Sequence, residues 1–152
     1  MQAGDLWPAL EKSLQKAVAG VVAMRRREGR ALAADITDQL KRMLVQISLI
    51  KGRTSALLKE GKSHMSSEEF SSFQKSNDIN EEIARLTHYI DEAKTLLKQA
   101  EGSGKKLDFI AQEMQRETNT IGSKVQDKEV SASVIAIKSK IEKIREQSNN
   151  VE

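Results

Sequence analysis

The sequence contains no cysteine, one proline and few aromatic residues, and each of these shortages excludes a class of protein. Without cysteine, the chain has no disulfide framework, no thiolate metal site and no thiol nucleophile. With one proline and eight glycines among 152 residues, few positions force a break in regular structure. Aromatic residues make up only 3% of the chain, so a hydrophobic core has to be built from Leu, Ile, Val, Ala and Met.

Segments that would direct the chain into or across a membrane are also missing. The start, Met1-Gln2-Ala3-Gly4-Asp5, has neither the basic nor the apolar region of a secretory signal. No apolar run approaches the length that spans a bilayer. We therefore expect a cytoplasmic protein without membrane contacts.

Two common enzyme motifs are absent as well. Gly102-Ser103-Gly104 has neither a preceding strand nor the Gly-Lys-Ser/Thr ending of a phosphate-binding loop. No serine lies in a nucleophile elbow. We therefore expect no small-molecule cofactor.

Charged residues, in contrast, are abundant and nearly balanced. They make up 31% of the chain, which favours helices with wide solvated faces. The net charge is +3 and the pI is about 9.1, so a nucleic-acid partner is permitted but not required. The densest basic cluster is Arg25-Arg26-Arg27. It is either a solvated helix face or a surface for RNA phosphates or an acidic partner.

Apolar residues recur with a helical period along almost the whole chain. In the best example, Leu32, Ile36, Leu40 and Met43 alternate steps of four and three residues, the spacing typical of coiled-coil packing. No alternating strand pattern of useful length occurs. The sequence predicts one all-α domain over residues 1–152, with long helices packed as antiparallel hairpins with coiled-coil-like seams. Similar seams run through residues 10–24, 79–100, 107–121 and 130–144.

Capping and breaking residues divide this pattern into helices. Residues 6–59 predict one very long helix, or two that meet at Gly29 or Gly52. A serine-rich linker is expected at 60–67, and Ser66-Ser67-Glu68-Glu69 predicts a capping box that opens the next helix. Three further positions are expected to start or end helices: Asp5 and Asp127 as N-caps, and Gly122 as the end of a helix that follows a break at Gly102 and Gly104. Phe70 and Phe73 are expected to pack against the end of the long helix.

The helix predicted over residues 104–124 carries the densest set of polar side chains. Its apolar face is expected to lie in the core, and Phe109 projects away from that face. An exposed aromatic side chain there suggests that something covers the polar face too. One polar stripe contains Asp108, Gln112, Arg116 and Asn119, and Lys106, Glu113, Glu117, Thr120 and Lys124 flank the apolar seam.

Although the chain has no cysteine, these residues allow metal binding by carboxylates and acid–base catalysis by histidine. Glu113 and Glu117 are one helical turn apart and could hold a hard divalent cation through oxygen ligands. Such an ion polarises a phosphodiester and acidifies a bound water, and His88 is a candidate acid or base. Alternatively, the glutamates form salt bridges with Lys106 and Lys124. Instead of having a functional role, Glu81 with Arg85 and His88 with Glu92 could be ordinary pairs of side chains four residues apart on an exposed helix face.

Four ordered motifs resemble one known family. They are Met24-Arg25 with Glu28-Gly29 and Leu32; Asp78-Ile79 with Glu81-Glu82, Arg85-Leu86 and His88; Gly104-Lys105-Lys106-Leu107-Asp108-Phe109 continuing through Gln112-Glu113-Met114, Arg116-Glu117 and Asn119 to Lys124; and Ile141 to Gln147 with Asn150-Val151-Glu152. This set resembles the YicC/YloC family of bacterial stress-associated endoribonucleases. The resemblance covers the C-terminal helical half of the family, whose members also carry an N-terminal α/β half, so it implies that this chain is a fragment or a shortened form.

The resemblance implies metal-dependent hydrolysis of RNA, with magnesium or manganese, by a ring-like homo-oligomer, possibly a hexamer. It also implies roles for particular residues. His88, Glu81, Glu82 and Asp108 would be catalytic, and Glu113 and Glu117 would bind the metal. Gln112 and Asn119 would read the 2′-hydroxyl or a base edge, and Arg25, Arg85, Lys106, Arg116, Lys124 and Arg145 would contact phosphates.

A second hypothesis places the chain in another class, as a non-catalytic module. In this interpretation the heptad seams pair helices within and between protomers, and the polar motifs form networks between subunits. A helical module that binds RNA without cleaving it is a third possibility, which predicts salt-dependent binding without turnover.

Overall fold

The structure is a computed structural model that describes residues 3–99 and 103–150, and it contains five α-helices in these ranges. They are α1 (Ala3–His64), α2 (Ser67–Ser76), α3 (Asn80–Leu97), α4 (Gly104–Lys124) and α5 (Lys128–Ser148). No strand occurs in the described ranges. The prediction of an all-α fold is confirmed.

The first helix is one continuous element of 62 residues. Gly29 and Gly52, the two positions at which the sequence allows a break, both lie inside it. A single helical glycine costs only about 1 kcal/mol relative to alanine, which the packing of the rest of the helix offsets. The helix already includes Ala3, so Asp5 lies in its first turn and the prediction of an N-cap there is wrong.

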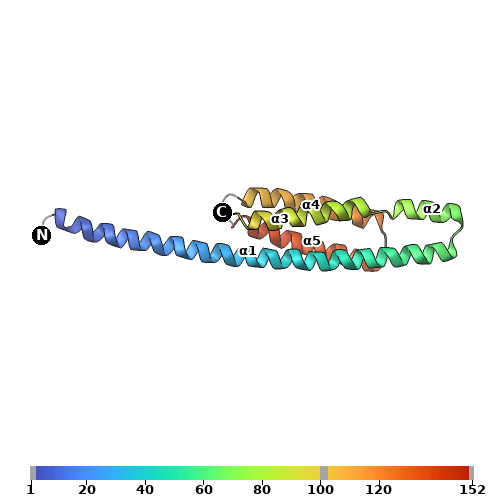
Figure 1. The fold of residues 1–152 in the computed structure, drawn as a ribbon, viewed down its shortest axis with the longest axis horizontal. Helices are drawn as coiled ribbons and strands as arrows, with labels where there is room; N and C mark the ends of the chain where they lie inside the picture. Colours follow the sequence, from blue (N-terminus) through green and yellow to red (C-terminus); the bar gives the residue numbers. More distant parts are fainter. Residues whose placement is uncertain (1–2, 100–102, 151–152) are drawn as a thin grey trace.

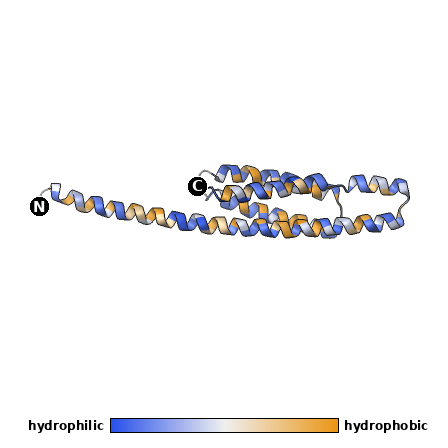
Figure 2. Ribbon diagram, viewed as in Figure 1, coloured by the Kyte–Doolittle hydropathy of each residue, from blue (hydrophilic) through white to orange (hydrophobic). Residues whose placement is uncertain are grey.

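Four helices form an antiparallel bundle in which each helix packs on two neighbours (Figure 1). The second half of α1 packs against α5 and α3, and α4 packs against both α3 and α5. Figure 2 shows the hydrophobic residues of these helices as interrupted stripes. The core consists of residues from the predicted seams, among them Leu40, Leu86, Met114 and Ile141, all fully buried. The antiparallel hairpins expected from the sequence are therefore present.

The connection between α1 and α2 is shorter than expected. We predicted a linker at 60–67, but α1 continues through His64 and only Met65 and Ser66 join the two helices. The predicted capping box is confirmed: Ser66 Oγ accepts from the backbone N–H of Glu69, and the Glu69 carboxylate accepts from the N–H of Ser66. Phe73 packs on Gly61, where an added Cβ would lie 3.2 Å from its ring. This contact explains a buried glycine within the last turn of α1.

Gly122 does not end α4, as the sequence suggested, because the helix continues to Lys124. A Cβ at Gly122 would lie 3.3 Å from Val134 on α5. The glycine is therefore a point of close contact between two helices instead of a helix end. Gly104 begins the helix, and Gly102 lies outside the described residues.

An ion cluster fixes the start of α5 to α1. Asp127 caps α5 by accepting from the N–H groups of Glu129 and Val130, as predicted. Its two oxygens also accept from Arg53 of α1, each at 3.1 Å. The hydrogen bond between them lowers the pKa of Asp127 and raises the pKa of Arg53.

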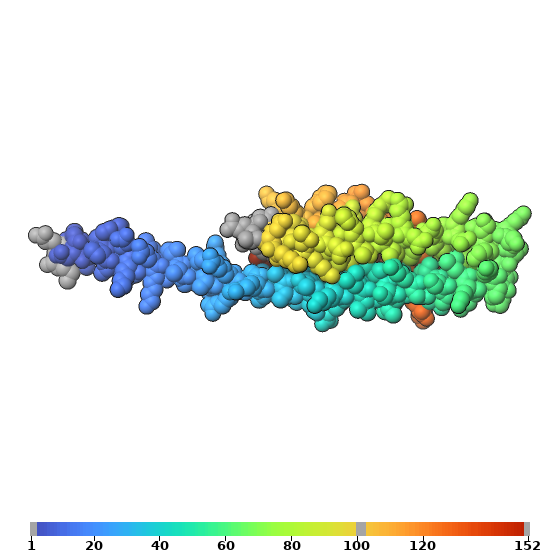
Figure 3. All heavy atoms as spheres, in the orientation of Figure 1, coloured from blue at the N-terminus to red at the C-terminus, as the bar shows by residue number. Residues whose placement is uncertain are grey.

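The first part of α1 extends beyond the bundle as an isolated helix (Figures 1 and 3). Every residue from 3 to 28 is exposed, and we call this segment the arm. Its apolar residues continue the heptad spacing, but no other described segment packs against them. No helix in the described ranges is long and apolar enough to cross a bilayer.

Candidate functional site

The antiparallel pairing of α3 and α4 brings together two of the segments that carry the predicted site residues. Two ion pairs join the helices, one between Lys124 and Glu82 and one between Arg85 and Glu117. We call this side of the bundle the α3–α4 face. Its predicted site residues are Glu81, Glu82, Arg85 and His88 from α3 and Lys106, Glu113, Arg116, Glu117 and Lys124 from α4.

The most deeply placed carboxylate of this face belongs to Glu82. Its side chain is only 6% exposed, and Oε1 accepts from Lys124 Nζ at 2.6 Å. Lys124 also donates to the carbonyl of Asp78 at 3.3 Å. The hydrogen bond with Glu82 raises the pKa of Lys124, so the ammonium stays charged at any physiological pH. The other carboxylate oxygen, Oε2, is buried without a hydrogen-bond partner among the described residues.

Arg85 connects carboxylates of both helices. It pairs with Glu81 one turn earlier on α3, and its Nη1 lies 3.8 Å from Glu117 Oε1 on α4. The Glu117 side chain is 8% exposed, whereas that of Arg85 is half exposed. A long contact to a solvated guanidinium compensates a buried carboxylate only partly. Glu117 is therefore a buried anion with a weak partner.

Glu113 lies one turn before Glu117 and pairs with Arg116 of its own helix at 3.7 Å. The alternative prediction, that the two glutamates pair with Lys106 and Lys124, is thus wrong. Glu113 pairs with Arg116 and Glu117 pairs with Arg85. Lys124 pairs with Glu82 instead. Among the described residues, no three histidine or acidic side chains lie close enough to form a metal site on their own. Two carboxylates one turn apart still match the donor set of magnesium, which keeps several waters and binds one or two carboxylates.

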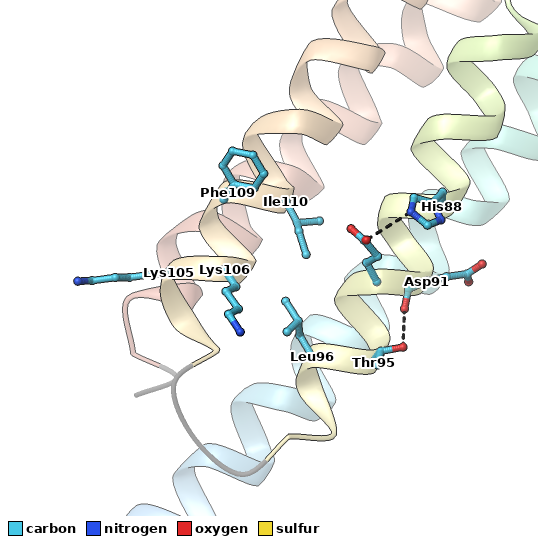
Figure 4. A pocket seen from close by; sticks show the side chains of 9 residues that line it. His88, Asp91, Thr95, Leu96, Lys105, Lys106, Phe109 and Ile110 are labelled. Carbon is cyan, nitrogen blue, oxygen red and sulfur yellow. Dashed lines mark hydrogen bonds and ion pairs between the residues drawn. The ribbon is translucent and has the colours of Figure 1, made fainter.

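A groove of about 690 Å³ opens farther along the α3–α4 face, toward the start of α4 (Figure 4). Leu96 and Ile110 point toward each other from the two helices and form its apolar floor, and Lys106 lies beside them. His88 borders the groove, with Nε2 at 3.3 Å from Glu92 Oε1. This pair confirms the ordinary contact expected from the four-residue spacing, as the Glu81–Arg85 pair does.

Phe109 lines the same groove and is 61% exposed. The expectation that it projects away from the core is confirmed. Of the residues that line the groove, only His88 and Lys106 were among the predicted site residues. Glu92 was predicted only as the partner of His88. For the apolar floor, the available signal was Ile110 in the seam of residues 107–121, whereas Leu96 was not placed in the predicted seam of residues 79–100.

The remaining predicted residues lie elsewhere. Asp108 accepts from Arg145 of α5 at 3.1 Å and from Gln112 at 3.0 Å, so these three residues form a separate cluster between α4 and α5. Asn119 is exposed on α4. Arg25 lies on the arm, beyond the bundle. The structure therefore divides the predicted set into the α3–α4 face, the α4–α5 cluster, the arm and the exposed Asn119.

The fold places the chain among helical-bundle proteins, with one helix that projects beyond the bundle. Comparisons with known proteins specify the family. The chain belongs to the family described as Endoribonuclease YicC-like, C-terminal, whose model matches residues 30–152. The resemblance seen in the sequence motifs is confirmed.

Two relatives carry the description "Probable endoribonuclease YicC". The protein of Clostridioides difficile (strain 630) is 31% identical over 165 aligned positions, which cover 97% of this chain and 56% of the relative. The protein of Haemophilus influenzae (strain ATCC 51907 / DSM 11121 / KW20 / Rd) is 30% identical over 146 positions, which cover 86% of this chain and 51% of the relative. The chain thus spans about half the length of these relatives.

Proposed function

We propose that this chain is the helical part of a metal-dependent endoribonuclease and that the α3–α4 face carries the reacting groups. The observation that supports this most directly is Glu117, a buried carboxylate with only a long contact to Arg85. Buried charges without close partners are costly and are often kept for function. The family membership supplies RNA as the substrate class.

In this proposal Glu113 and Glu117 would hold a magnesium or manganese ion through their carboxylate oxygens. Such an ion would supply charge neutralisation at the phosphodiester and would lower the pKa of a water molecule. Glu113 is half-buried and close to solvent, so it can exchange its contact with Arg116 for a metal ion at little cost. Arg85 and Arg116 are then free to contact phosphate oxygens, for which guanidinium groups are well suited.

His88 is the proposed proton-transfer group because histidine exchanges a proton near neutral pH. Its contact with Glu92 orients the imidazole at the border of the groove. Glu81 orients Arg85. Glu82 is committed to Lys124 inside the bundle, so we assign it a positioning role. Asp108 and Arg145 position the start of α4 from its other side.

The groove is the proposed site for one unpaired nucleotide of the RNA. An exposed aromatic ring such as Phe109 is a stacking platform for a base, and Lys106 can reach its phosphate. Gln112 and Asn119 lie exposed on the neighbouring side of α4, where they would contact the adjoining sugar or base edge. A cytoplasmic location would be consistent with such a substrate.

The test is cleavage of a labelled, structured RNA by the 152-residue chain with Mg²⁺ or Mn²⁺ and with a chelator. We expect cleavage that depends on the metal and that Glu113→Gln reduces by at least 100-fold. Glu142→Gln, an exposed position on α5, is the matched control and should retain full activity. Cleavage that is equally fast with the chelator, or in Glu113→Gln, would contradict the proposal.

The second candidate is a non-catalytic assembly or RNA-binding module. The pair between Glu82 and Lys124 favours it, because both side chains are used to join helices. Salt-dependent RNA binding without turnover under the same conditions would support this module. In that case the reacting groups would lie outside this chain.

A further inference from the structure

The arm carries an apolar stripe that no other described segment covers. Trp7 and Leu14, the most exposed of these residues, are 63% and 64% accessible. Soluble monomers rarely expose contiguous apolar surface of more than a few hundred Å², so a stripe of this length indicates an interaction surface. It comprises Leu6, Trp7, Leu10, Leu14, Val18, Val21, Val22 and Met24.

We propose that the arms of two copies of this chain pair side by side in antiparallel orientation. The heptad positions of the apolar residues support the arm of a second copy as the partner. Trp7, Leu14 and Val21 occupy the first core position of successive heptads, and Leu10, Ala17 and Met24 occupy the second. In an antiparallel pair, the first core position of one helix faces the second core position of the other. One register satisfies every layer: Trp7 faces Met24, Leu10 faces Val21 and Leu14 faces Ala17 of the second copy.

The same register fits the length of the arm. It places residue 3 opposite residue 28 of the second copy, so the paired segments coincide with the exposed segment 3–28. Burial within the bundle begins only after this segment, and Ile36 is the first fully buried residue. Two arms can therefore overlap over their whole exposed length, about 39 Å at 1.5 Å per residue, without either bundle obstructing the other arm.

Charge distribution favours the antiparallel orientation over the parallel one. Arg25, Arg26 and Arg27 lie at one end of the arm next to Glu28, whereas the other half is balanced, with Asp5 and Glu11 offset by Lys12 and Lys16. In the antiparallel register Asp5 of each copy lies level with Arg26 of the other, and the two arginine clusters lie at opposite ends of the pair. Parallel pairing would place the two arginine clusters together, which costs free energy through repulsion between like charges.

The apolar area is sufficient for a reversible dimer. Fully burying an aliphatic side chain removes on the order of 60–120 Å² from water, so half-exposed side chains each contribute roughly 50 Å². Two stripes together then bury on the order of 800 Å² of apolar surface, which corresponds to about 1,300 Å² in total at ordinary interface composition. This lies within the range of specific protein–protein interfaces.

The proposal does not depend on which residues react with RNA, because the arm is a separate part of α1 that lies outside the α3–α4 face. The first measurement is sedimentation velocity of the 152-residue chain between 1 and 200 µM, concentrations chosen for the micromolar affinity that such an interface supports. We expect a monomer–dimer equilibrium that Leu14→Glu weakens at least 100-fold. Leu49→Glu introduces the same charge at a similarly exposed position of α1 within the bundle and should leave the equilibrium unchanged.

Orientation is tested with cysteine variants, since the chain has no native cysteine to interfere. After mild oxidation, a mixture of Leu10→Cys and Val21→Cys should form a disulfide-linked dimer, while each variant alone should not. Antiparallel pairing separates identical positions by about 16 Å at 1.5 Å per residue. Cross-linking of each variant with itself would indicate a parallel pair and overturn the register. A monomer up to 200 µM would overturn the proposal altogether.

Discussion

The buried carboxylate of Glu117 leads to a prediction in which stability and activity change in opposite directions. We expect Glu117→Gln to raise the free energy of unfolding by about 1 kcal/mol while it abolishes cleavage. The substitution keeps the size and shape of the side chain and removes its charge. It therefore isolates the cost of holding an anion at a site that is 8% exposed.

The magnitude follows from the geometry. Two unit charges 3.8 Å apart attract each other by about 1 kcal/mol in water and about 4 kcal/mol at an effective dielectric constant of 20. Because Arg85 is half exposed and also pairs with Glu81, the lower part of this range applies. Removing a carboxylate from water costs several kcal/mol even after relaxation. The cost exceeds the attraction, so a neutral amide is expected to be more stable by about 1 kcal/mol.

The assay is urea unfolding followed by circular dichroism at 222 nm, together with thermal unfolding. A gain of about 1 kcal/mol corresponds to roughly 2–4 °C in Tm for a chain of this size. Met114→Ala, a fully buried core substitution, is the sensitivity control and should lose about 3 kcal/mol. A loss of more than about 1 kcal/mol in Glu117→Gln would refute the reasoning, since it would mean that the carboxylate is well paired and structural.

Three further predictions concern the caps, the glycines and the groove. Because the pKa of Asp127 is lowered in the folded state, its stabilising contribution is fully present above about pH 4, its ordinary value, and is lost as the pH falls through the lowered pKa. Asp127→Asn should therefore have a lower Tm at pH 7, and the difference in Tm should shrink below pH 4. Gly52→Ala, which would contact nothing within 4 Å, should stabilise the chain by about 0.5–1 kcal/mol in urea unfolding, whereas Gly61→Ala should bring no gain because its Cβ would press on Phe73. Phe109→Ala should weaken binding of a single-stranded RNA by about 5- to 150-fold in a filter or anisotropy assay; an unchanged affinity would remove the groove from the RNA path.

Most of the bundle could be predicted from the sequence because heptad spacing determines which side of each helix is apolar. Leu40, Leu86 and Ile141 were placed in seams by spacing alone and are all buried. Spacing does not reveal what covers a seam. Leu10 and Leu14 follow the same pattern as Leu40, but they remain exposed because the other helices of the bundle do not extend along the arm.

Several of the errors and omissions have the same physical cause, which is contact between residues distant in the chain. Glycine at position 122 looked like a helix end from local propensity alone, whereas its close contact with Val134 on α5 explains the residue. The pairing of Glu82 with Lys124 spans 42 residues and leaves no local signal. Pairs within one helix, such as His88 with Glu92, could be predicted because the helical repeat itself places them together.

The continuity of α1 means that the direction in which the arm presents its apolar stripe depends on the number of residues between the arm and the bundle. An α-helix turns about 100° and advances about 1.5 Å per residue. One residue inserted near Gly29 would rotate the stripe by about 100° relative to the α3–α4 face, whereas seven would return it to within about 20° and move it about 10 Å outward. A molecule that binds the arm is therefore held at a fixed rotation about the axis of α1 relative to the groove. The helix that fixes this rotation is about 93 Å long. The chain length of this segment is thus a geometric constraint on any assembly built from it.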